Sequence, residues 1–189
     1  MVNTKKRLVF LKEFFKDFKV ASLIPTSNTA VKNALDKLNL ETKKTVVEYG
    51  PGEGVFTYAI LERLPADSKL IVIETNLEFI NILNKIDDER LIVLHDSAEN
   101  IEALMEKEDC ASVDVIISGI PLSLLPKAVV TKIIQNSCKS LSENGILFIY
   151  QHSFFAMKFL KKEFTTVEKY FEPMNLPPLF FMKALKNKV

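Results

Sequence analysis

Short runs of β-branched and aliphatic residues alternate with longer amphipathic stretches between residues 45 and 151. This alternation is typical of βαβ units, in which helices join parallel strands. The predicted strands span residues 45–49, 69–74, 91–95, 113–118 and 145–151, and the predicted helices span residues 55–64, 76–86, 98–107 and 127–141. Right-handed crossovers would place these helices on both faces of the sheet, so we expect a three-layer α/β sandwich.

The two ends of the chain add elements to this sheet. Residues 164–167 and 179–182 are strand-like runs separated by the proline-rich segment 175–178, which predicts an antiparallel hairpin. With that hairpin the sheet would be mostly parallel and seven-stranded. Two helices are predicted before the first strand, at residues 5–19 and 27–40. The length suits one domain, residues 1–189, in which residues 1–40 form N-terminal helices that could act as a lid or touch a membrane.

A glycine-rich turn lies between the first predicted strand and the helix that follows it. Gly50, Gly52 and Gly54 lack a Cβ atom, so the turn can be tight and a ligand can lie against bare backbone. Pro51 lies within the turn, and Glu48 precedes it. A dinucleotide-binding turn has its third glycine one residue later, so the spacing does not fit that class.

Polar residues follow the next two predicted strands. Glu74 ends the second strand 20 residues after Gly54, the spacing at which a carboxylate binds ribose hydroxyls, and Thr75 follows it. Asp96 and Ser97 follow the third strand, where a carboxylate can accept a hydrogen bond from an adenine amino group. Because the carboxyl ends of parallel strands meet at one edge of the sheet, these residues predict a trough shaped for adenosine.

The segment from Glu48 to Gly54 resembles the first motif of the class I S-adenosylmethionine-dependent methyltransferases, acid-x-Gly-x-Gly-x-Gly. The resemblance implies a Rossmann-like methyltransferase fold and S-adenosylmethionine as the cofactor. It also implies that Glu48 and the glycine turn face the methionine end of the cofactor. By the same resemblance Glu74 would face the ribose, and Asp96 with Ser97 the adenine.

The segment after the fourth predicted strand bears on the methyl acceptor. It reads Ser118-Gly119-Ile120-Pro121-Leu122, where the methyltransferases that act on adenine have Asn or Asp, two prolines and an aromatic residue. Ser118 lacks the amide that would bind a base amino group, and Leu122 lacks the ring on which a flipped base would stack. These departures argue against a nucleic-acid partner. The chain is otherwise similar to the ribosomal RNA adenine dimethyltransferases, so RNA adenine methylation stays an alternative.

Nearly the whole chain shows a closer resemblance to the bacterial phospholipid N-methyltransferases, which methylate the amine of phosphatidylethanolamine. The shared segments are residues 21–27, 48–57, 117–122 and 175–178. This resemblance implies a phospholipid head group as the methyl acceptor. A small-molecule methyltransferase is a further alternative.

The charge of the chain is asymmetric, although its formal net value is only +1. Residues 1–20 carry six basic side chains against two acidic ones, and five apolar side chains, Phe10 and Phe14 among them, share one face of the predicted helix. Such a helix could lie on an anionic membrane or pack on the sheet, and the sequence leaves both open. Charged residues interrupt this segment before a secretory core could form, so we expect a cytoplasmic protein, peripheral on the inner face of the membrane if the helix binds lipid. Cys110 and Cys138 form no metal-binding pattern, and no metal is expected.

A protonated amine must lose a proton before it accepts a methyl group, so a polar side chain is expected close to it. Ser118, Tyr150 and His152 follow or end predicted strands and are the candidates for this role. Ser118 and Gly119 are also expected near the cofactor. Ser27 is expected there as well, since it precedes a helix that could face the mouth of the site, although it could serve only as the N-cap of that helix.

Overall fold

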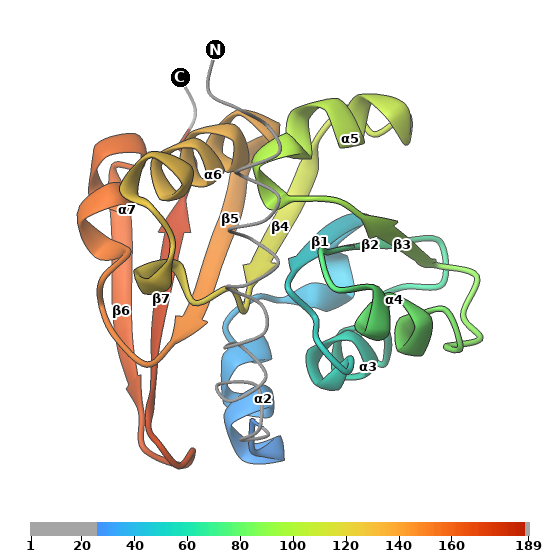
Figure 1. Cartoon of the computed structure of the whole chain (residues 1–189), viewed down its shortest axis with the longest axis horizontal. Helices are drawn as coiled ribbons and strands as arrows, with labels where there is room; N and C mark the ends of the chain where they lie inside the picture. Colours follow the sequence, from blue (N-terminus) through green and yellow to red (C-terminus); the bar gives the residue numbers. More distant parts are fainter. Residues whose placement is uncertain (1–25, 188–189) are drawn as a thin grey trace.

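Seven strands form one sheet in the order β3-β2-β1-β4-β5-β7-β6 within residues 26–187, the part of the chain that the computed structural model describes (Figure 1). The strands are β1 Thr45–Tyr49, β2 Lys69–Glu74, β3 Leu91–His95, β4 Val113–Ser118, β5 Leu141–Gln151, β6 Thr166–Glu172 and β7 Leu179–Leu185. Strands β1 to β5 pair in parallel, whereas β7 lies antiparallel between β5 and β6. The mostly parallel sheet with a C-terminal antiparallel hairpin is therefore confirmed.

Helices cover both faces of the sheet and complete the three layers. The helices are α2 Asn28–Leu35, α3 Val55–Leu61, α4 Leu77–Leu83, α5 Ile101–Lys107, α6 Lys127–Ser140 and α7 Met157–Glu163, with 3-10 turns η1 Leu40–Thr42, η2 Ala98–Asn100 and η3 Leu122–Leu124. The layer of α5, α6 and α7 packs on one face, and α2, α3 and α4 pack on the other. Within residues 26–187, none of the helices is long and apolar enough to cross a bilayer.

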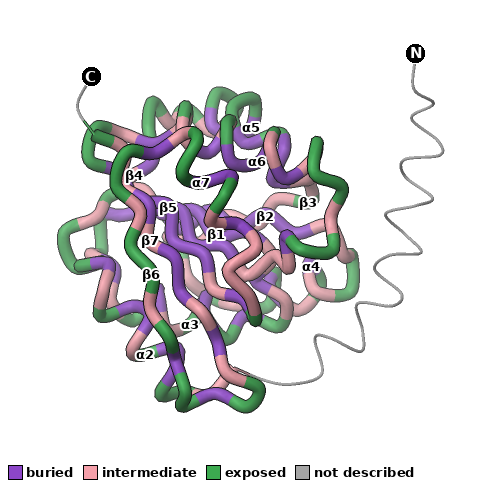
Figure 2. Tube along the Cα trace, turned by 90° about the vertical axis from the view of Figure 1, so that its left-hand side faces the viewer, coloured by how far each residue is buried: buried purple, intermediate pink, exposed green. Residues whose placement is uncertain are grey.

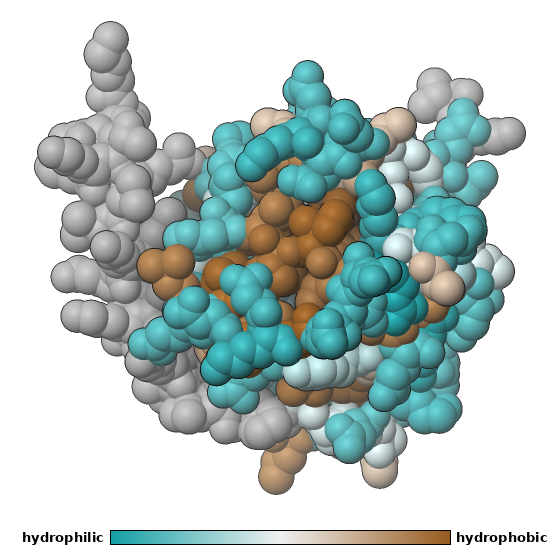
Figure 3. Space-filling model, turned by 90° about the vertical axis from the view of Figure 1, so that its right-hand side faces the viewer, coloured by the Kyte–Doolittle hydropathy of each residue, from teal (hydrophilic) through white to brown (hydrophobic). Residues whose placement is uncertain are grey.

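The central strands are buried on both faces, which Figure 2 shows as purple along the middle of the molecule. Val46 faces the α2–α4 layer and Val47 faces the α5–α7 layer, and neither is accessible to solvent. Burial on both sides explains the continuous aliphatic runs in the sequence. The edge strand β3 is only half-buried. The side of the molecule that carries β3 and α4 in Figure 1 faces the viewer in Figure 3, where it shows a hollow with a hydrophobic floor.

The structure departs from the predicted elements mainly in the C-terminal part of the chain. A helix that was not predicted, α7, connects β5 with β6. Strand β6 continues to Glu172, well beyond the predicted end at residue 167, because an edge strand with exposed side chains need not alternate hydrophobic and polar residues. The helix predicted at residues 27–40 ends at Leu35. The helix predicted at residues 5–19 lies outside the described residues.

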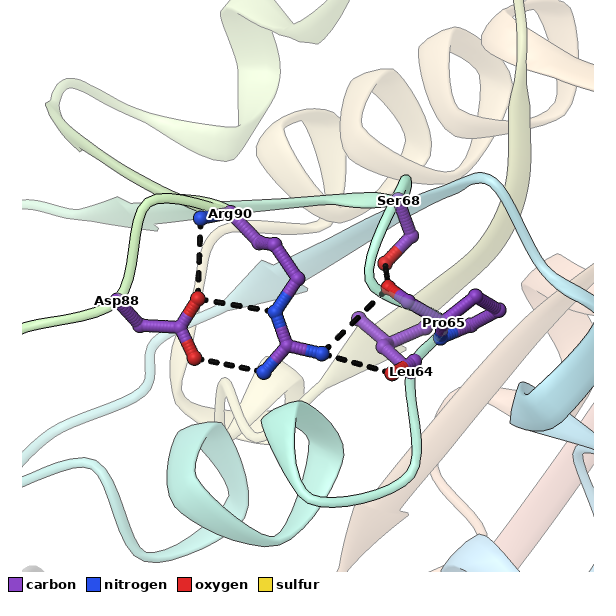
Figure 4. Close-up of polar contacts among 5 residues, drawn as sticks. All are labelled: Leu64, Pro65, Ser68, Asp88 and Arg90. Carbon is purple, nitrogen blue, oxygen red and sulfur yellow. Dashed lines mark hydrogen bonds and ion pairs between the residues drawn. The ribbon is translucent and has the colours of Figure 1, made fainter.

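A partly buried guanidinium network closes the amino-terminal edge of the sheet, opposite the strand ends that carry the predicted site. Arg90 donates through Nε and Nη2 to the two carboxylate oxygens of Asp88, at 2.9 and 2.6 Å (Figure 4). Arg90 Nη1 donates to the carbonyl oxygen of Leu64 at 2.7 Å, which ties the segment before β2 to the segment before β3. Hydrogen bonding by Arg90 holds the pKa of Asp88 below its usual range.

Candidate active site

The glycine turn between β1 and α3 has the open backbone that its sequence predicts. Gly50, Gly52 and Gly54 have φ angles of +64°, +57° and +92°, in the left-handed region that favours glycine. A Cβ atom added to Gly52 would meet no atom within 4 Å, so this part of the turn faces open space. A hydrogen bond of 3.0 Å from Gly50 N to the Ile73 carbonyl oxygen fixes the turn on β2. A ligand can therefore lie against its backbone.

The Glu74 carboxylate faces the glycine turn from the end of β2. Its Oε1 accepts hydrogen bonds from the backbone nitrogens of Thr75 and Asn76, at 2.7 and 2.8 Å. Its Oε2 lies 3.4 Å from the donating nitrogen of Gly52. The carboxylate is thus held at a fixed position between the turn and the start of α4, where it can accept further hydrogen bonds from a sugar.

The Asp96 carboxylate is held in a similar way at the end of β3. Its Oδ1 accepts hydrogen bonds from the Ser97 backbone nitrogen at 2.6 Å and from Asn100 Nδ2 at 2.7 Å. Ser97 Oγ in turn caps the turn η2 by accepting from Glu99 N at 3.4 Å. Both bonds to Asp96 use the same oxygen, so the other oxygen has no hydrogen-bond partner among residues 26–187 and is suited to an adenine amino group.

Glu48 lies behind the glycine turn, with no accessible surface. Thr57 on α3 donates a hydrogen bond of 2.7 Å to Glu48 Oε2, while Oε1 has no hydrogen-bond partner within residues 26–187. Burial raises the pKa of Glu48 to about 8, the Thr57 hydrogen bond opposes this rise, and the charge of Glu74 adds to it. The carboxyl group is therefore largely protonated at neutral pH.

One cavity of about 440 Å³ joins most of the predicted site residues at the carboxyl edge of the sheet. The predicted residues that line it are Gly50, Pro51, Gly52, Glu74, Thr75, Asp96, Ser97, Gly119, Tyr150 and His152. Those that do not line it are Glu48, Gly54, Ser118 and Ser27. Eight of the twelve residues predicted to bind the cofactor and two of the three acceptor-side candidates thus line one cavity.

The residues outside the lining have structural positions of their own. Ser118 is buried, and its hydroxyl has no hydrogen-bond partner within residues 26–187. Ser27 caps α2, because its Oγ accepts from Ala30 N at 3.1 Å and donates to the Met174 carbonyl oxygen at 2.6 Å. Its neighbour Thr26 lines the cavity instead. Gly54 begins α3, where an added Cβ atom would meet Leu83 at 3.3 Å.

The side chain of Tyr150 extends from β5 to Gly119, the residue that follows β4. Its ring stacks on Phe56 of α3, with ring centres 4.1 Å apart. Its hydroxyl oxygen lies so close to Gly119 that a Cβ atom there would be 2.3 Å away. Burial raises the pKa of Tyr150, and the charges of Glu48 and Glu74 raise it further, so the hydroxyl stays protonated at neutral pH. It can donate a hydrogen bond inside the cavity, but it cannot act as a strong base.

One ring nitrogen of His152 forms a hydrogen bond with the backbone, and the other has no hydrogen-bond partner within residues 26–187. Nδ1 lies 2.9 Å from the Pro178 carbonyl oxygen, which can only accept a hydrogen bond. The neutral ring therefore carries its proton on Nδ1, and Nε2 keeps a lone pair. Because His152 also lines the cavity, it can take a proton from a group bound there.

Sequence reasoning missed an apolar wall of the cavity. Leu125, Val129 and Ile133 line it, and their spacing of four residues puts them on one side of α6 and the turn before it. That spacing was visible in the sequence, but it is equally typical of a helix that packs on the core. The wall lies in the same cavity as Asp96, so apolar contact and a carboxylate can together hold a nucleoside base.

These residues fit a nucleoside with an amino-acid tail better than they fit a metal. Three features can bind different parts of such a ligand. The open glycine turn can hold the amino-acid tail, the fixed Glu74 carboxylate can bind the sugar, and the Asp96 carboxylate, which has one oxygen without a partner within residues 26–187, can bind the base. Residues 26–187 contain no group of three or more His, Cys, Asp or Glu side chains that could hold a metal ion.

Comparison with known proteins agrees with this description. Residues 16–163 match the family described as ribosomal RNA adenine dimethylase. An ornithine lipid N-methyltransferase of Singulisphaera acidiphila is 27% identical over 189 residues, which cover 97% of this chain and 98% of that protein. A ribosomal RNA small subunit methyltransferase A of Alcanivorax borkumensis is 38% identical over 60 residues, which cover 32% of this chain and 20% of that protein.

Solved structures share the fold at low sequence identity. The crystal structure of the N-methyltransferase NodS from Bradyrhizobium japonicum, in complex with S-adenosyl-l-homocysteine, superposes with a TM-score of 0.69 at 14% identity. The superposition covers 86% of this chain and 89% of that one.

Proposed function

The chain belongs to the ribosomal RNA adenine dimethylase family and is an S-adenosylmethionine-dependent N-methyltransferase, and we propose that its methyl acceptor is the amine of a phospholipid head group such as phosphatidylethanolamine. The relative that is similar over nearly its whole length is named for an amine-bearing lipid. The relative named for ribosomal RNA is similar over a much shorter stretch.

The observation that carries this proposal is the apolar lining of the cavity away from the glycine turn. Leu124 and Leu179 line it there, and Leu124 is 51% exposed. A hydrophobic side chain that is both exposed and part of a cavity wall suits an acceptor whose amine is attached to an apolar body. A small charged metabolite would gain little from such a wall.

The residues at the other end of the cavity would hold the cofactor. The glycine turn would seat the methionine end, Glu74 would accept hydrogen bonds from the ribose hydroxyls, and Asp96 would accept one from the adenine amino group. When bound, S-adenosylmethionine supplies an electrophilic methyl group on a sulfonium. Leu125 and Val129 exclude water from the base, which strengthens the polar contacts beside it.

His152 is the residue that we expect to take the proton of the acceptor amine. The Pro178 carbonyl oxygen fixes the ring with the proton on Nδ1, so Nε2 can accept the proton that leaves the ammonium nitrogen. The protonated Tyr150 hydroxyl lies against Gly119, both residues line the cavity, and the hydroxyl can orient the groups bound there. Ser118 takes no part in this scheme because it does not line the cavity.

RNA adenine methylation is the second candidate, because the family carries that name. The position where an aromatic ring would stack on a flipped base is Leu122, which is 1% exposed and packs in the core. A side chain buried in this way cannot support a base, so we rank this function second.

The test is to offer the purified full chain radiolabelled S-adenosylmethionine with one acceptor class at a time. The acceptors are vesicles of phosphatidylethanolamine and phosphatidylglycerol, total RNA, and water-soluble ethanolamine. We expect label in the lipid extract, migrating as methylated phosphatidylethanolamine on a thin-layer plate. Label confined to RNA or to the soluble amine would refute the proposed acceptor, and the Glu74→Ala variant serves as the background control.

A further inference from the structure

The end of β6 and the turn between β6 and β7 expose an unusual amount of hydrophobic surface. Phe171, Met174 and Leu176, together called the hydrophobic tip here, are 59%, 60% and 85% exposed. They are three of the seven large hydrophobic side chains that are exposed within residues 26–187. The turn projects beyond the sheet beside α2 in Figure 1, and Figure 3 shows hydrophobic side chains projecting at the same lower edge of the molecule.

Polar residues fill the inside of this turn and hold the hydrophobic tip outward. Asn175 is 5% exposed, its Oδ1 accepts from Ser27 N at 2.8 Å, and its Nδ2 donates to the Pro177 carbonyl oxygen at 2.8 Å. Glu172 is 4% exposed, and its oxygens accept from Met174 N and from Asn33 Nδ2, both at 2.8 Å. A turn that buries Asn and Glu while it exposes Met and Leu reverses the usual order, which indicates that the outer face meets an apolar medium.

The hydrophobic tip is connected to the mouth of the active-site cavity on two sides. On one side, Ser27 donates to the Met174 carbonyl oxygen at 2.6 Å, and the preceding residue, Thr26, lines the cavity. On the other side, Pro178 and Leu179 directly follow the turn, and Leu179 lines the cavity. An apolar medium that covers the hydrophobic tip would therefore also reach the mouth.

We propose that the hydrophobic tip inserts into the surface of a lipid bilayer and thereby sets the mouth of the cavity against the lipid head groups. The inference rests on the proposed phospholipid acceptor, and it adds the element that docks the enzyme. A projecting turn can enter a bilayer, whereas a protein partner would need a matching groove. Two lysines lie on or against β6, the strand that leads into the turn, and suit anionic head groups: exposed Lys169, and Lys37, whose Nζ lies 4.3 Å from the centre of the Tyr170 ring.

The first test compares flotation of the full chain and two variants with vesicles of phosphatidylethanolamine and phosphatidylglycerol. Leu176→Ser removes hydrophobic surface from the tip, and Leu77→Ser removes the same side chain from α4, where Leu77 is 59% exposed. We expect the vesicle partition coefficient to fall roughly tenfold for Leu176→Ser, from the loss of several inserted methylene groups, and to stay unchanged for Leu77→Ser. Equal flotation of the two variants and the parent chain would overturn the proposal.

The second test uses the absence of tryptophan from the native chain. Leu176→Trp and Leu77→Trp each introduce a single fluorophore at an exposed site. On addition of the vesicles we expect a blue shift and quenching by brominated lipid for Leu176→Trp only. Quenching of neither fluorophore, or of both equally, would contradict insertion of the tip. The proposal would also be overturned if the parent chain formed a dimer in the absence of vesicles and Leu176→Ser dissociated that dimer, because the tip would then contact a second copy.

Activity separates this inference from the proposed function. If both are correct, Leu176→Ser lowers methylation of vesicle phosphatidylethanolamine by about the factor lost in flotation, and calorimetric binding of S-adenosylmethionine is unchanged. If the parent chain docks through the tip but methylates no lipid, the proposed acceptor fails and the docking surface stands. If lipid is methylated equally by both chains and flotation is equal, the docking surface fails and the acceptor stands.

Discussion

Replacement of Glu48 by glutamine tests the electrostatics of the glycine turn most directly. The carboxyl group is fully buried, it receives one hydrogen bond from Thr57, and its other oxygen has no partner within residues 26–187. Glutamine has nearly the same shape and carries no charge at any pH. The Glu48→Gln variant therefore removes the titration of this site while it keeps the packing against α3.

The magnitude follows from the pKa of Glu48, which burial raises from 4.5 to about 8. Below about pH 4.5 the group is protonated in the folded and unfolded states, so it costs no stability. As the pH rises towards 8, the unfolded state ionises and the folded state does not, so the free energy of unfolding falls with increasing pH. At roughly 1.4 kcal/mol per pH unit, the loss at pH 7 is about 3 kcal/mol relative to a neutral side chain. Glutamine avoids this loss, but its amide group must find new hydrogen-bond partners in the buried site. We expect that requirement to cost about 1 kcal/mol, which reduces the gain in stability.

Urea unfolding at pH 5, 7 and 8.5, followed by circular dichroism, measures the effect. We expect Glu48→Gln to be more stable than the parent chain by about 2 kcal/mol at pH 7, with little difference at pH 5. Parallel pH profiles for the two proteins would refute the reasoning, because they would mean that the buried carboxyl group does not titrate in this range. A conservative control is Glu53→Gln, which changes an exposed acid in the same turn.

The remaining predictions concern other parts of the molecule. Glu74→Ala should weaken cofactor binding about 10- to 100-fold in calorimetry, since it removes the carboxylate that faces the ribose seat, and an unchanged Kd would rule out that role. Gly119→Ala should destabilise the fold by about 2 kcal/mol in urea unfolding, since its Cβ atom would be 2.3 Å from the Tyr150 hydroxyl oxygen. Adding Tyr150→Leu should restore part of the lost stability, and no recovery would contradict the contact. Arg90→Ala should cost about 2 kcal/mol in urea and leave kcat unchanged, because its network lies at the opposite edge of the sheet; a large fall in kcat would disprove that separation. His152→Ala should lower kcat about 100-fold at neutral pH with cofactor affinity unchanged, and should recover at higher pH where more of the amine is already neutral; an unaffected kcat would exclude it as the proton acceptor.

The sheet and the cofactor end of the site could be predicted because local sequence determines them. Strands β1 to β4 begin and end at the predicted residues, since each is a run of mainly aliphatic side chains between polar turns. The glycine turn has the positive φ angles that its composition predicts. Glu74 and Asp96 line the same cavity because the carboxyl ends of parallel strands must meet at one edge.

The direction of single side chains at strand ends could not be predicted, because it depends on pairing with strands distant in the sequence. Ser118 pairs with Ile149 of β5, and this register turns its hydroxyl into the core. Tyr150 comes two residues after Phe148 on the same face, and there it stacks on Phe56 and reaches Gly119. Ser118 ends β4 and Tyr150 is the last residue but one of the neighbouring strand β5, yet only Tyr150 lines the cavity.

The acceptor end of the site depends on the topology of the C-terminal hairpin. Because β7 runs antiparallel to β5, with Gln151 paired to Phe180, the turn that precedes β7 must lie at the carboxyl edge of the parallel strands, beside the cavity. In the sequence, Met174 and Leu176 have the composition of ordinary core residues, and only the burial of Asn175 beneath them turns them outward. A change of acceptor class should therefore need changes in this turn and around His152, and none in the glycine turn. Exchange of residues 173–177 for a polar turn of equal length would test this: loss of lipid methylation with full cofactor binding is expected, whereas loss of cofactor binding would show that the two ends of the cavity are not independent.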